Sequence, residues 1–267
     1  MYPKRNDKFR PRPERRQEDN DQMIYGIRPV IEAINAGKEL DRLFIGRGAK
    51  GELMAELKDL LKTRMIPWTD VPVEKLNRLT RNNHQDVVGF ISTISYAKLE
   101  DVVPGIFERG ETPFIIMLDR VTDVRNFGAI ARTAECAGVH AIVIPAKGAA
   151  QVSADAIKTS AGALNRITVC RENNLRSAIE FLHQSGVRVA AATEKGKTDY
   201  FDNDLTGPIA IVMGSEEDGV SNDIIRLADE LCRIPLMGKI SSLNVSVAAG
   251  VLMYEVVRLR RTTSAGR

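Results

Sequence analysis

Three segments of the chain place polar side chains directly after an apolar run, and ligands of an open α/β sheet bind beyond the carboxyl ends of its strands. The first segment is DVRNFGAIARTA, residues 123–134, which follows the apolar run 114–118. Asn126 is a candidate helix cap, and Gly128 in the first turn lets a ligand or another chain approach closely. Because Asn126 and Arg132 are six residues apart, a site that uses both must reach across the helix start. The alternative is a cap and an unrelated surface arginine.

The second segment is MGSEEDGVS, residues 213–221, in which Gly214 and Gly219 bracket three acidic residues that include Glu216. A phosphate-binding loop needs backbone donors without neighbouring carboxylates, so this loop does not suit a phosphate. The chain also has no GxGxxG or GxxxxGK[ST] motif between a strand and a helix. Carboxylates at a strand end suit a ligand with cationic character or hydroxyl donors. The alternative is an acidic helix N-terminus capped by Ser221.

The third segment is IPLMGKISSLNVSV, residues 234–247, which runs from a loop into an apolar helix. Ser241 or Ser242 can cap that helix. Capping does not account for Asn244 and Ser246, which have mediocre helix propensity and need hydrogen-bond partners if they are buried.

The elements that position these segments follow from the hydrophobic pattern. Five apolar runs alternate with helical segments, at residues 114–118, 141–144, 167–170, 187–192 and 209–213. Near-continuous apolar strands that alternate with helices indicate a mostly parallel sheet covered on both faces. The predicted fold class is therefore α/β.

The chain divides into four predicted regions. Residues 1–21 hold seven Lys or Arg and three prolines by residue 20, which predicts a disordered basic arm, either a solubilising tail or an RNA-steering segment. Residues 22–96 read as a small α/β domain. Residues 97–112 contain Pro104, Gly105 and Gly110 and are the predicted linker, and residues 113–267 form the larger domain.

Composition limits the function. The chain has 38 Lys and Arg against 35 Asp and Glu, so any polyanionic partner must bind a locally basic patch. Three widely spaced cysteines without a CxxC pair argue against a disulfide framework and a zinc site. With no long apolar run and no signal peptide, we expect a soluble cytoplasmic protein without a membrane span or a metal. An aromatic content of 5% gives little material for stacking on the bases of a single-stranded nucleic acid.

The three segments together resemble the motifs of the SpoU/TrmH family of RNA ribose methyltransferases, in the SPOUT class. The resemblance is carried by Asn126-x-Gly128-x-x-x-Arg132, Gly214-Ser215-Glu216-x-x-Gly219-x-Ser221 and Ile234-Pro235-x-x-Gly238-x-x-x-Ser242-Leu243-Asn244-Val245-Ser246. The N-terminal unit resembles the family's ribosomal-protein-like substrate-binding domain, through Tyr25-Gly26-Ile27 and His84-Gln85. The likeness spans about residues 22–260. Val124 stands where the family usually has proline, and Asp86 where it commonly has glycine.

The resemblance implies a trefoil-knotted C-terminal domain, a homodimer that packs through it, and S-adenosylmethionine as cofactor. It implies transfer of a methyl group to a ribose 2′-hydroxyl, most closely that of a guanosine in 23S ribosomal RNA. The alternative substrate is tRNA. The alternative from another class is a non-catalytic RNA-binding or ribosome-assembly module.

The resemblance also assigns residues. The implied cofactor-binding residues are Met213, Gly214, Ile234, Gly238, Ser242 and Leu243. The candidate RNA-binding residues are His84, in the implied RNA-binding domain, and Arg28, a basic residue that either meets phosphate or is simply solvated. The implied catalytic residues are Asn126, Arg132, Glu216 and Asn244. Asn126 would orient Arg132 or the ribose, and Glu216 would fix the geometry of the loop and of Arg132. Asn244, with Ser242 alongside, would complete the pocket. A guanidinium is essentially never deprotonated, so we expect Arg132 to stabilise the oxyanion and orient a phosphate rather than act as a base.

Overall fold

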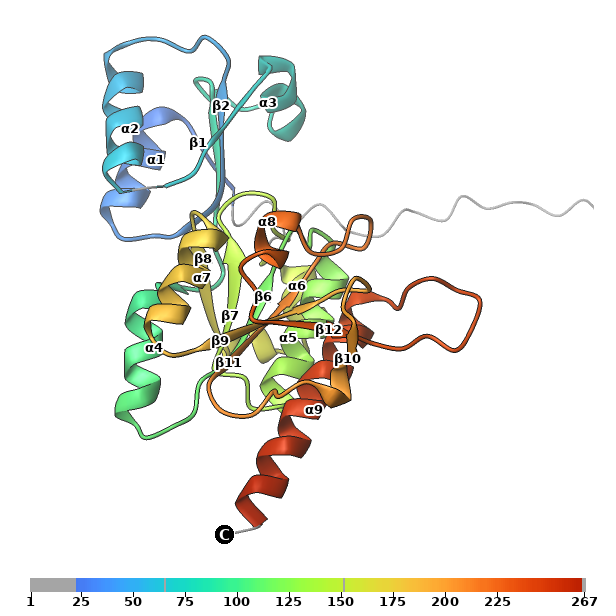
Figure 1. Cartoon of the computed structure of the whole chain (residues 1–267). Helices are drawn as coiled ribbons and strands as arrows, with labels where there is room; N and C mark the ends of the chain where they lie inside the picture. The colour runs from blue at the N-terminus through green and yellow to red at the C-terminus, as the bar shows by residue number, and fades with distance from the viewer. Residues whose placement is uncertain (1–22, 65, 151, 266–267) are drawn as a thin grey trace, which may run out of the picture.

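The structure is a computed structural model that describes residues 23–64, 66–150 and 152–265. The predicted arm, residues 1–21, lies outside the described residues. Two sheets organise the chain: a small one near the N-terminus and a large one that carries the three polar segments (Figure 1).

The N-terminal domain is a four-stranded sheet in the order β1-β4-β2-β3. Its elements are β1 (Met23–Tyr25), α1 (Ile27–Asn35), β2 (Leu40–Gly46), α2 (Glu52–Thr63), β3 (Thr69–Val71), α3 (Val73–Leu79) and β4 (Val87–Ile91). Strand β4 is antiparallel to β1 and β2, and β3 runs parallel to β2. One buried cluster contains Val30 from α1, Ile45 from β2 and Leu57 from α2, while Leu76 from α3 lies in a second cluster.

The larger domain is an eight-stranded sheet in the order β10-β12-β9-β11-β6-β7-β8-β5. Its strands are β5 (Tyr96–Ala97), β6 (Phe114–Leu118), β7 (Ala141–Pro145), β8 (Thr168–Glu172), β9 (Arg188–Ala192), β10 (Thr198–Asp199), β11 (Ile209–Met213) and β12 (Glu230–Arg233). Every pairing in this sheet is parallel. The five predicted apolar runs are confirmed as strands of a parallel sheet.

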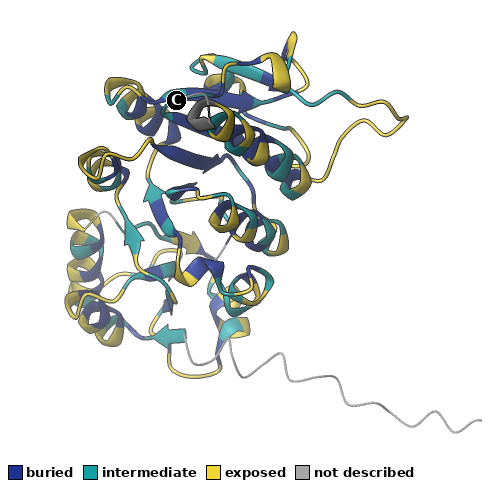
Figure 2. Cartoon of the chain, turned by 90° about the horizontal axis from the view of Figure 1, so that it is seen from below, coloured by how far each residue is buried: buried dark blue, intermediate teal, exposed yellow. Residues whose placement is uncertain are grey.

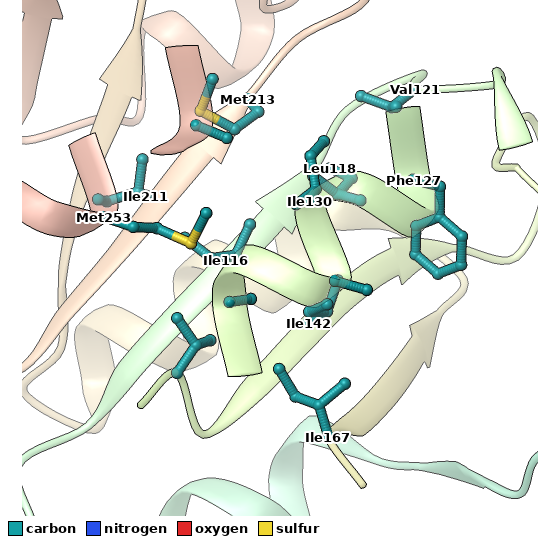
Figure 3. Packing of buried hydrophobic residues seen from close by; sticks show 14 of the residues in the cluster. Ile116, Leu118, Val121, Phe127, Ile130, Ile142, Ile167, Ile211, Met213 and Met253 are labelled. Atoms are coloured by element: carbon teal, nitrogen blue, oxygen red, sulfur yellow. The ribbon is translucent and has the colours of Figure 1, made fainter. Parts of the chain in front are cut away.

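Helices cover both faces of the large sheet, as predicted. They are α4 (Leu99–Glu108), α5 (Val124–Cys136), α6 (Ala154–Thr159), α7 (Leu175–Gln184), α8 (Asn222–Ile225) and α9 (Val245–Ala265), with short 3₁₀ turns at Ala163–Asn165 and Tyr200–Asp202. Strand β6 contributes to a hydrophobic layer on each face of the sheet, because successive side chains of a strand point to opposite faces. Ile116 packs with α5 and α9, and Ile115 packs with α4 and α7. Figure 3 shows the first of these layers, in which Ile130 of α5 and Met253 of α9 meet the sheet. The implied trefoil knot stays a prediction.

The segment predicted as a linker contains a helix. Pro104 and Gly105 lie inside α4 rather than in an irregular connection, and the role of residues 97–112 as a linker between domains stays a prediction. Proline inside a helix costs about 3 kcal/mol. Leu99, Val103 and Ile106 are buried at helical spacing, and burial of each stabilises by about 1.5–3 kcal/mol, which offsets that cost.

Gly128 serves a contact between two helices of the same chain. A Cβ atom at this position would lie 2.8 Å from the Thr159 Cβ and 2.9 Å from the Ala156 carbonyl oxygen, both on α6. The sequence predicted a close approach here by a ligand or another chain, and the structure shows α6 instead.

Among the described residues, no helix is both long and apolar enough to cross a membrane. All three cysteines are unpaired; Cys170 and Cys232 are buried and Cys136 is exposed.

Arg171 joins the two domains. From the end of β8 its guanidinium donates to the Leu40 carbonyl oxygen at 2.7 Å, pairs with Glu39 at 3.2 Å and stacks 4.1 Å from the centre of the Tyr96 ring. The Tyr96 hydroxyl donates to Asp41. Burial raises the pKa of the Asp41 carboxyl, and the bond from Tyr96 opposes that rise. The N-terminal domain is therefore held to the sheet by a few polar contacts around one cation.

We predict that Arg171→Ala lowers the free energy of unfolding by about 1–3 kcal/mol, because hydrogen bonds from a charged group are lost at a largely buried position. The radius of gyration in small-angle X-ray scattering should also rise as the domains separate. Arg176→Ala on α7 is the matched control, since that side chain is exposed. Equal stability and equal scattering for the two variants would contradict the role of Arg171.

Candidate active site

The candidate site lies at the carboxyl ends of β6 and β11. These strands are neighbours in parallel register, with Leu118 opposite Met213, so the loops that follow them emerge side by side. The pairing continues one residue further, because the Asp119 N–H donates to the Met213 carbonyl oxygen at 2.8 Å. The first two polar segments are brought together in this way.

Asn126 has its side chain available to the site because another residue caps α5. The helix begins at Val124, and the Asp123 carboxylate accepts from the Asn126 backbone N–H at 2.8 Å. The prediction that Asn126 caps the helix was therefore wrong. The amide group of Asn126 projects from the first turn of α5, where it can bond to other segments.

The loop after β11 is tight, and Gly214 makes it so. Ser215 and Gly219 exchange two backbone hydrogen bonds, at 3.1 Å and 3.0 Å. A Cβ atom on Gly214 would lie 2.0 Å from the Gly219 carbonyl carbon, which no side chain permits. The tight loop alone therefore accounts for a glycine at position 214, whether or not Gly214 also binds a cofactor. Glu216 lies at the tip of this loop.

The third segment enters α9 through Asn244. Its side-chain oxygen accepts from the Ser246 backbone N–H at 3.0 Å and from the Ser246 hydroxyl at 2.6 Å, which is the arrangement of a helix cap. The helix begins at Val245, so neither Ser241 nor Ser242 caps it. Asn244 and Ser246, which capping by a serine could not explain, are therefore hydrogen-bonded to each other.

Asn126, Glu216 and Asn244 form a closed hydrogen-bonded network that joins the three segments. The Asn126 amide donates to Glu216 Oε1 at 2.8 Å, and the Asn244 amide lies 2.9 Å from both Glu216 Oε1 and Asn126 Oδ1. Three of the four predicted catalytic side chains therefore meet, although they lie 28 to 118 residues apart in the sequence.

Beside this network lies a hollow of about 310 Å³. Its polar lining includes the carboxylates of Asp123, Glu216, Glu217 and Asp218, with Arg120 as the one cation among the lining residues. This donor set repels a phosphate and complements a positive charge, so it fits a sulfonium cofactor. Among the described residues, no group of three or more His, Cys, Asp or Glu side chains could hold a metal ion.

Arg132 lies outside this hollow. It is exposed on α5, and its guanidinium makes no hydrogen bond or ion pair with any other described residue. Six residues of helix place it about 9 Å along the axis from Asn126 and on a different side. The structure therefore separates Arg132 from the other three predicted catalytic residues of the same chain.

The predicted cofactor-binding residues fall into two groups. Met213 and Gly214 are buried at the end of β11, and Ile234 is half-buried against the main core cluster. Gly238, Ser242 and Leu243 lie in the exposed loop 236–244, which extends away from the sheet (Figure 2). The structure does not bring the two groups together. The loop carries exposed apolar side chains, with Met237 98% and Ile240 79% exposed.

The two predicted RNA-binding residues lie at the same end of the small sheet, where β1 ends and β4 begins. Arg28 is exposed on α1. The start of that helix meets the other motif directly, because the Ile27 N–H donates to Gln85 Oε1 at 3.2 Å. His84 is 9% exposed; its Nδ1 accepts from the Asp86 N–H at 3.0 Å, which leaves Nε2 to donate to Asn77 Oδ1 at 2.9 Å. Both ring nitrogens of His84 therefore hold the turn before β4.

Sequence reasoning missed Asp119 and Arg120, which hold the loop that carries Glu216. Asp119 is 5% exposed and accepts from the Ser221 N–H at 2.7 Å, while Arg120 contacts Asp218 and Gly219. The available signal was a charged pair directly after an apolar strand.

We predict that Gly214→Ala lowers the free energy of unfolding by about 2 kcal/mol or more, because the new methyl group must displace backbone. Thermal unfolding measures this change. Gly238→Ala is the control for stability, since a Cβ there meets nothing within 4 Å. If the two variants unfold at the same temperature, the tight loop is not as described.

Comparisons with known proteins agree with this geometry. Residues 113–254 match the SpoU rRNA Methylase family, and residues 23–97 match the family of RNA 2′-O ribose methyltransferase substrate-binding domains. The putative TrmH family tRNA/rRNA methyltransferase YacO of Bacillus subtilis is 35% identical over 89% of this chain and 95% of its own length.

Two solved structures are also similar. An AdoMet-bound rRNA methyltransferase from Sinorhizobium meliloti is 28% identical, with a TM-score of 0.57 over 90% of this chain and 87% of that one. A TrmH/SpoU tRNA modifying enzyme from A. aeolicus is 28% identical, with a TM-score of 0.53 over 62% of this chain and 86% of that one. The chain belongs to the SpoU/TrmH family of RNA methyltransferases, as its three motifs predicted.

Proposed function

We propose that this protein transfers a methyl group from S-adenosylmethionine to a ribose 2′-hydroxyl of RNA. The observation that carries the proposal is the network of Asn126, Glu216 and Asn244, which joins three motif segments beside a hollow at the ends of β6 and β11. The family to which the chain belongs supplies the class of reaction.

S-adenosylmethionine, when bound, supplies an electrophilic methyl group on a positively charged sulfur. Gly214 and Met213 would hold it at the end of β11, together with Ile234 after β12. Gly238, Ser242 and Leu243 would join them when loop 236–244 folds over the hollow. The two groups of predicted cofactor-binding residues lie apart in the structure, so binding by all six would require this movement.

Arg132 would act on the RNA. A 2′-hydroxyl is a weak nucleophile that develops negative charge as its proton passes to a water molecule or the adjacent RNA phosphate. A guanidinium stabilises such charge as a fixed donor, while the cofactor sulfur leaves with the electrons of the broken C–S bond. Arg132 has no partner among the described residues to compete with this role. The ribose would be oriented by Asn126 and Glu216 of the second copy in the homodimer proposed below, because Arg132 is separated from those residues in its own chain. Asn244 would hold the cofactor side of the site.

We propose ribosomal RNA as the substrate, and within it a guanosine of 23S rRNA, as the motifs imply. The rRNA enzyme from S. meliloti aligns with 90% of this chain, whereas the tRNA enzyme from A. aeolicus aligns with 62%. The additional aligned length supports a substrate that needs the N-terminal domain, on which Arg28 is exposed. This substrate places the protein in the cytoplasm.

We also propose a homodimer that packs through the larger domain. Val247 and Tyr254 on α9 are 53% and 51% exposed, and Leu243 just before the helix is 41% exposed. Together with loop 236–244 they give the domain an apolar surface that a second copy would bury.

We predict that Arg132→Ala reduces methyl transfer from labelled S-adenosylmethionine to unmodified 23S rRNA by about 100-fold or more, the usual loss for one stabilising donor. Its melting temperature and cofactor affinity should match the wild-type values, because the side chain is exposed and makes no described contact. Arg132→Lys should also lose activity, since an ammonium lacks the planar pair of donors.

Arg176→Ala is the matched control and should keep full activity. Mass spectrometry of the labelled nucleoside identifies the product, with total tRNA assayed in parallel. Label in tRNA alone would overturn the rRNA substrate, and retained activity in Arg132→Ala would overturn the role of that residue. RNA binding without cofactor affinity, measured by calorimetry, would instead support a non-catalytic binding module.

We predict that Val247→Glu converts the dimer to a monomer in analytical ultracentrifugation, because two buried carboxylates would face one interface. Secondary structure by circular dichroism should be unchanged, since Val247 is exposed within the chain. Lys197→Glu alters charge at another exposed position and serves as the control. A monomeric wild-type protein, or a dimeric variant, would contradict the proposed interface.

A further inference from the structure

Arg120 occupies a backbone conformation that side chains rarely adopt. Its φ angle is +58°. Arg120 is the second residue after the end of strand β6 and follows Asp119. The left-handed region is unfavourable for a long side chain, because the Cβ atom approaches the following carbonyl oxygen. Residues held in this way persist where their surroundings fix them and are concentrated at functional sites.

The side chain of Arg120 bonds to the loop after β11. Its Nη1 donates to Asp218 at 3.0 Å and its Nη2 donates to the Gly219 carbonyl oxygen at 3.0 Å, while Nε lies 3.4 Å from Asp119. The same Gly219 oxygen accepts from the Ser215 N–H at 3.1 Å, so Arg120 reinforces the contact that closes the loop.

Asp119 holds the other end of the same loop. Its Oδ2 accepts from the Ser221 N–H at 2.7 Å. Two consecutive residues therefore fix the segment from Ser215 to Ser221, and Glu216 lies between the fixed points. Glu216 is the residue to which Asn126 and Asn244 both donate.

We propose that Arg120 is a positioning residue for methyl transfer: it fixes the loop 215–219 so that the Glu216 carboxylate meets Asn126 and Asn244. This inference rests on the proposed function and adds a residue to its site. The left-handed backbone at Arg120 directs the guanidinium across to Asp218 and Gly219, which explains why a strained conformation is retained there.

Direct contact between Arg120 and an RNA phosphate is the competing role. The guanidinium already has three protein partners, and the nearby carboxylates of Asp119 and Asp218 reduce its attraction for a polyanion. A positioning residue acts through Glu216, whereas a phosphate contact acts on RNA affinity and on its salt dependence. The two roles therefore predict different measurements.

Two variants of Arg120 test the proposal. Arg120→Gly removes the side chain and also relieves the backbone, so it should fold even if Arg120→Ala does not. Arg120→Lys keeps the charge but offers no planar pair of donors. We expect kcat for rRNA methylation to fall about tenfold in Arg120→Gly, with KM for RNA and for cofactor unchanged within about twofold and partial recovery in Arg120→Lys.

A double-mutant cycle with Glu216→Ala provides the decisive readout. If Arg120 acts through Glu216, Arg120→Gly should cause no further loss of kcat in the Glu216→Ala background. An additive loss, an unchanged kcat in the single variant, or weaker RNA binding with a salt slope reduced by about one would each overturn the proposal.

Amide hydrogen exchange of Ser215 and Gly219 tests the same proposal without the reaction. Exchange should be faster in Arg120→Gly than in the wild type and unchanged in the control Arg176→Ala. If the wild-type protein methylates no RNA, the proposed function fails while exchange still reports on the loop. Unchanged exchange in Arg120→Gly would overturn the positioning role whatever the substrate.

Discussion

A single carboxylate oxygen, Oε1 of Glu216, accepts hydrogen bonds from Asn126 and Asn244, and this shared acceptor is the point where three distant segments meet. The acceptor is exposed, and an exposed hydrogen bond contributes only about 0.5–1.5 kcal/mol. The network is therefore too weak to assemble the segments. The buried sheet must bring them together first, and the hydrogen bonds then set the orientation of the side chains.

The pairing of β6 with β11 is the part of the sheet on which this orientation depends. It places Asp119 against the end of β11. From there Asp119 and Arg120 form hydrogen bonds with the loop that follows β11. Helix α9 reaches the same point because Val245, the residue after Asn244, is buried in the core cluster with α5. A slip of one residue in either strand would turn every side chain to the opposite face and separate the network.

The sequence predicts the strands of this arrangement better than its turns. Apolar runs 114–118 and 209–213 coincide with β6 and β11, because a fully buried parallel strand leaves a continuous apolar signature. The caps were misassigned, since Asp123, Asn126, Ser242 and Asn244 are all acceptable caps and only the start of each helix decides between them. The role of Arg120 was missed, because a charged pair after an apolar strand does not indicate the positive φ angle that directs its side chain.

Two features lack partners within the described part of the chain, and they lie close together. Arg132 precedes Thr133, whose methyl group lies 3.7 Å from where a side chain on Gly250 of α9 would begin. The same helix exposes Val247 and Tyr254, and the loop before it exposes Met237 and Ile240. Water solvates a single exposed guanidinium readily, but exposed apolar side chains in a row are unfavourable in water. The apolar surface is therefore a stronger argument than Arg132 for a partner that covers this region. A second copy of the chain that covers this surface would place a subunit interface next to α5. Arg132 would then meet RNA at that interface rather than lie in bulk solvent.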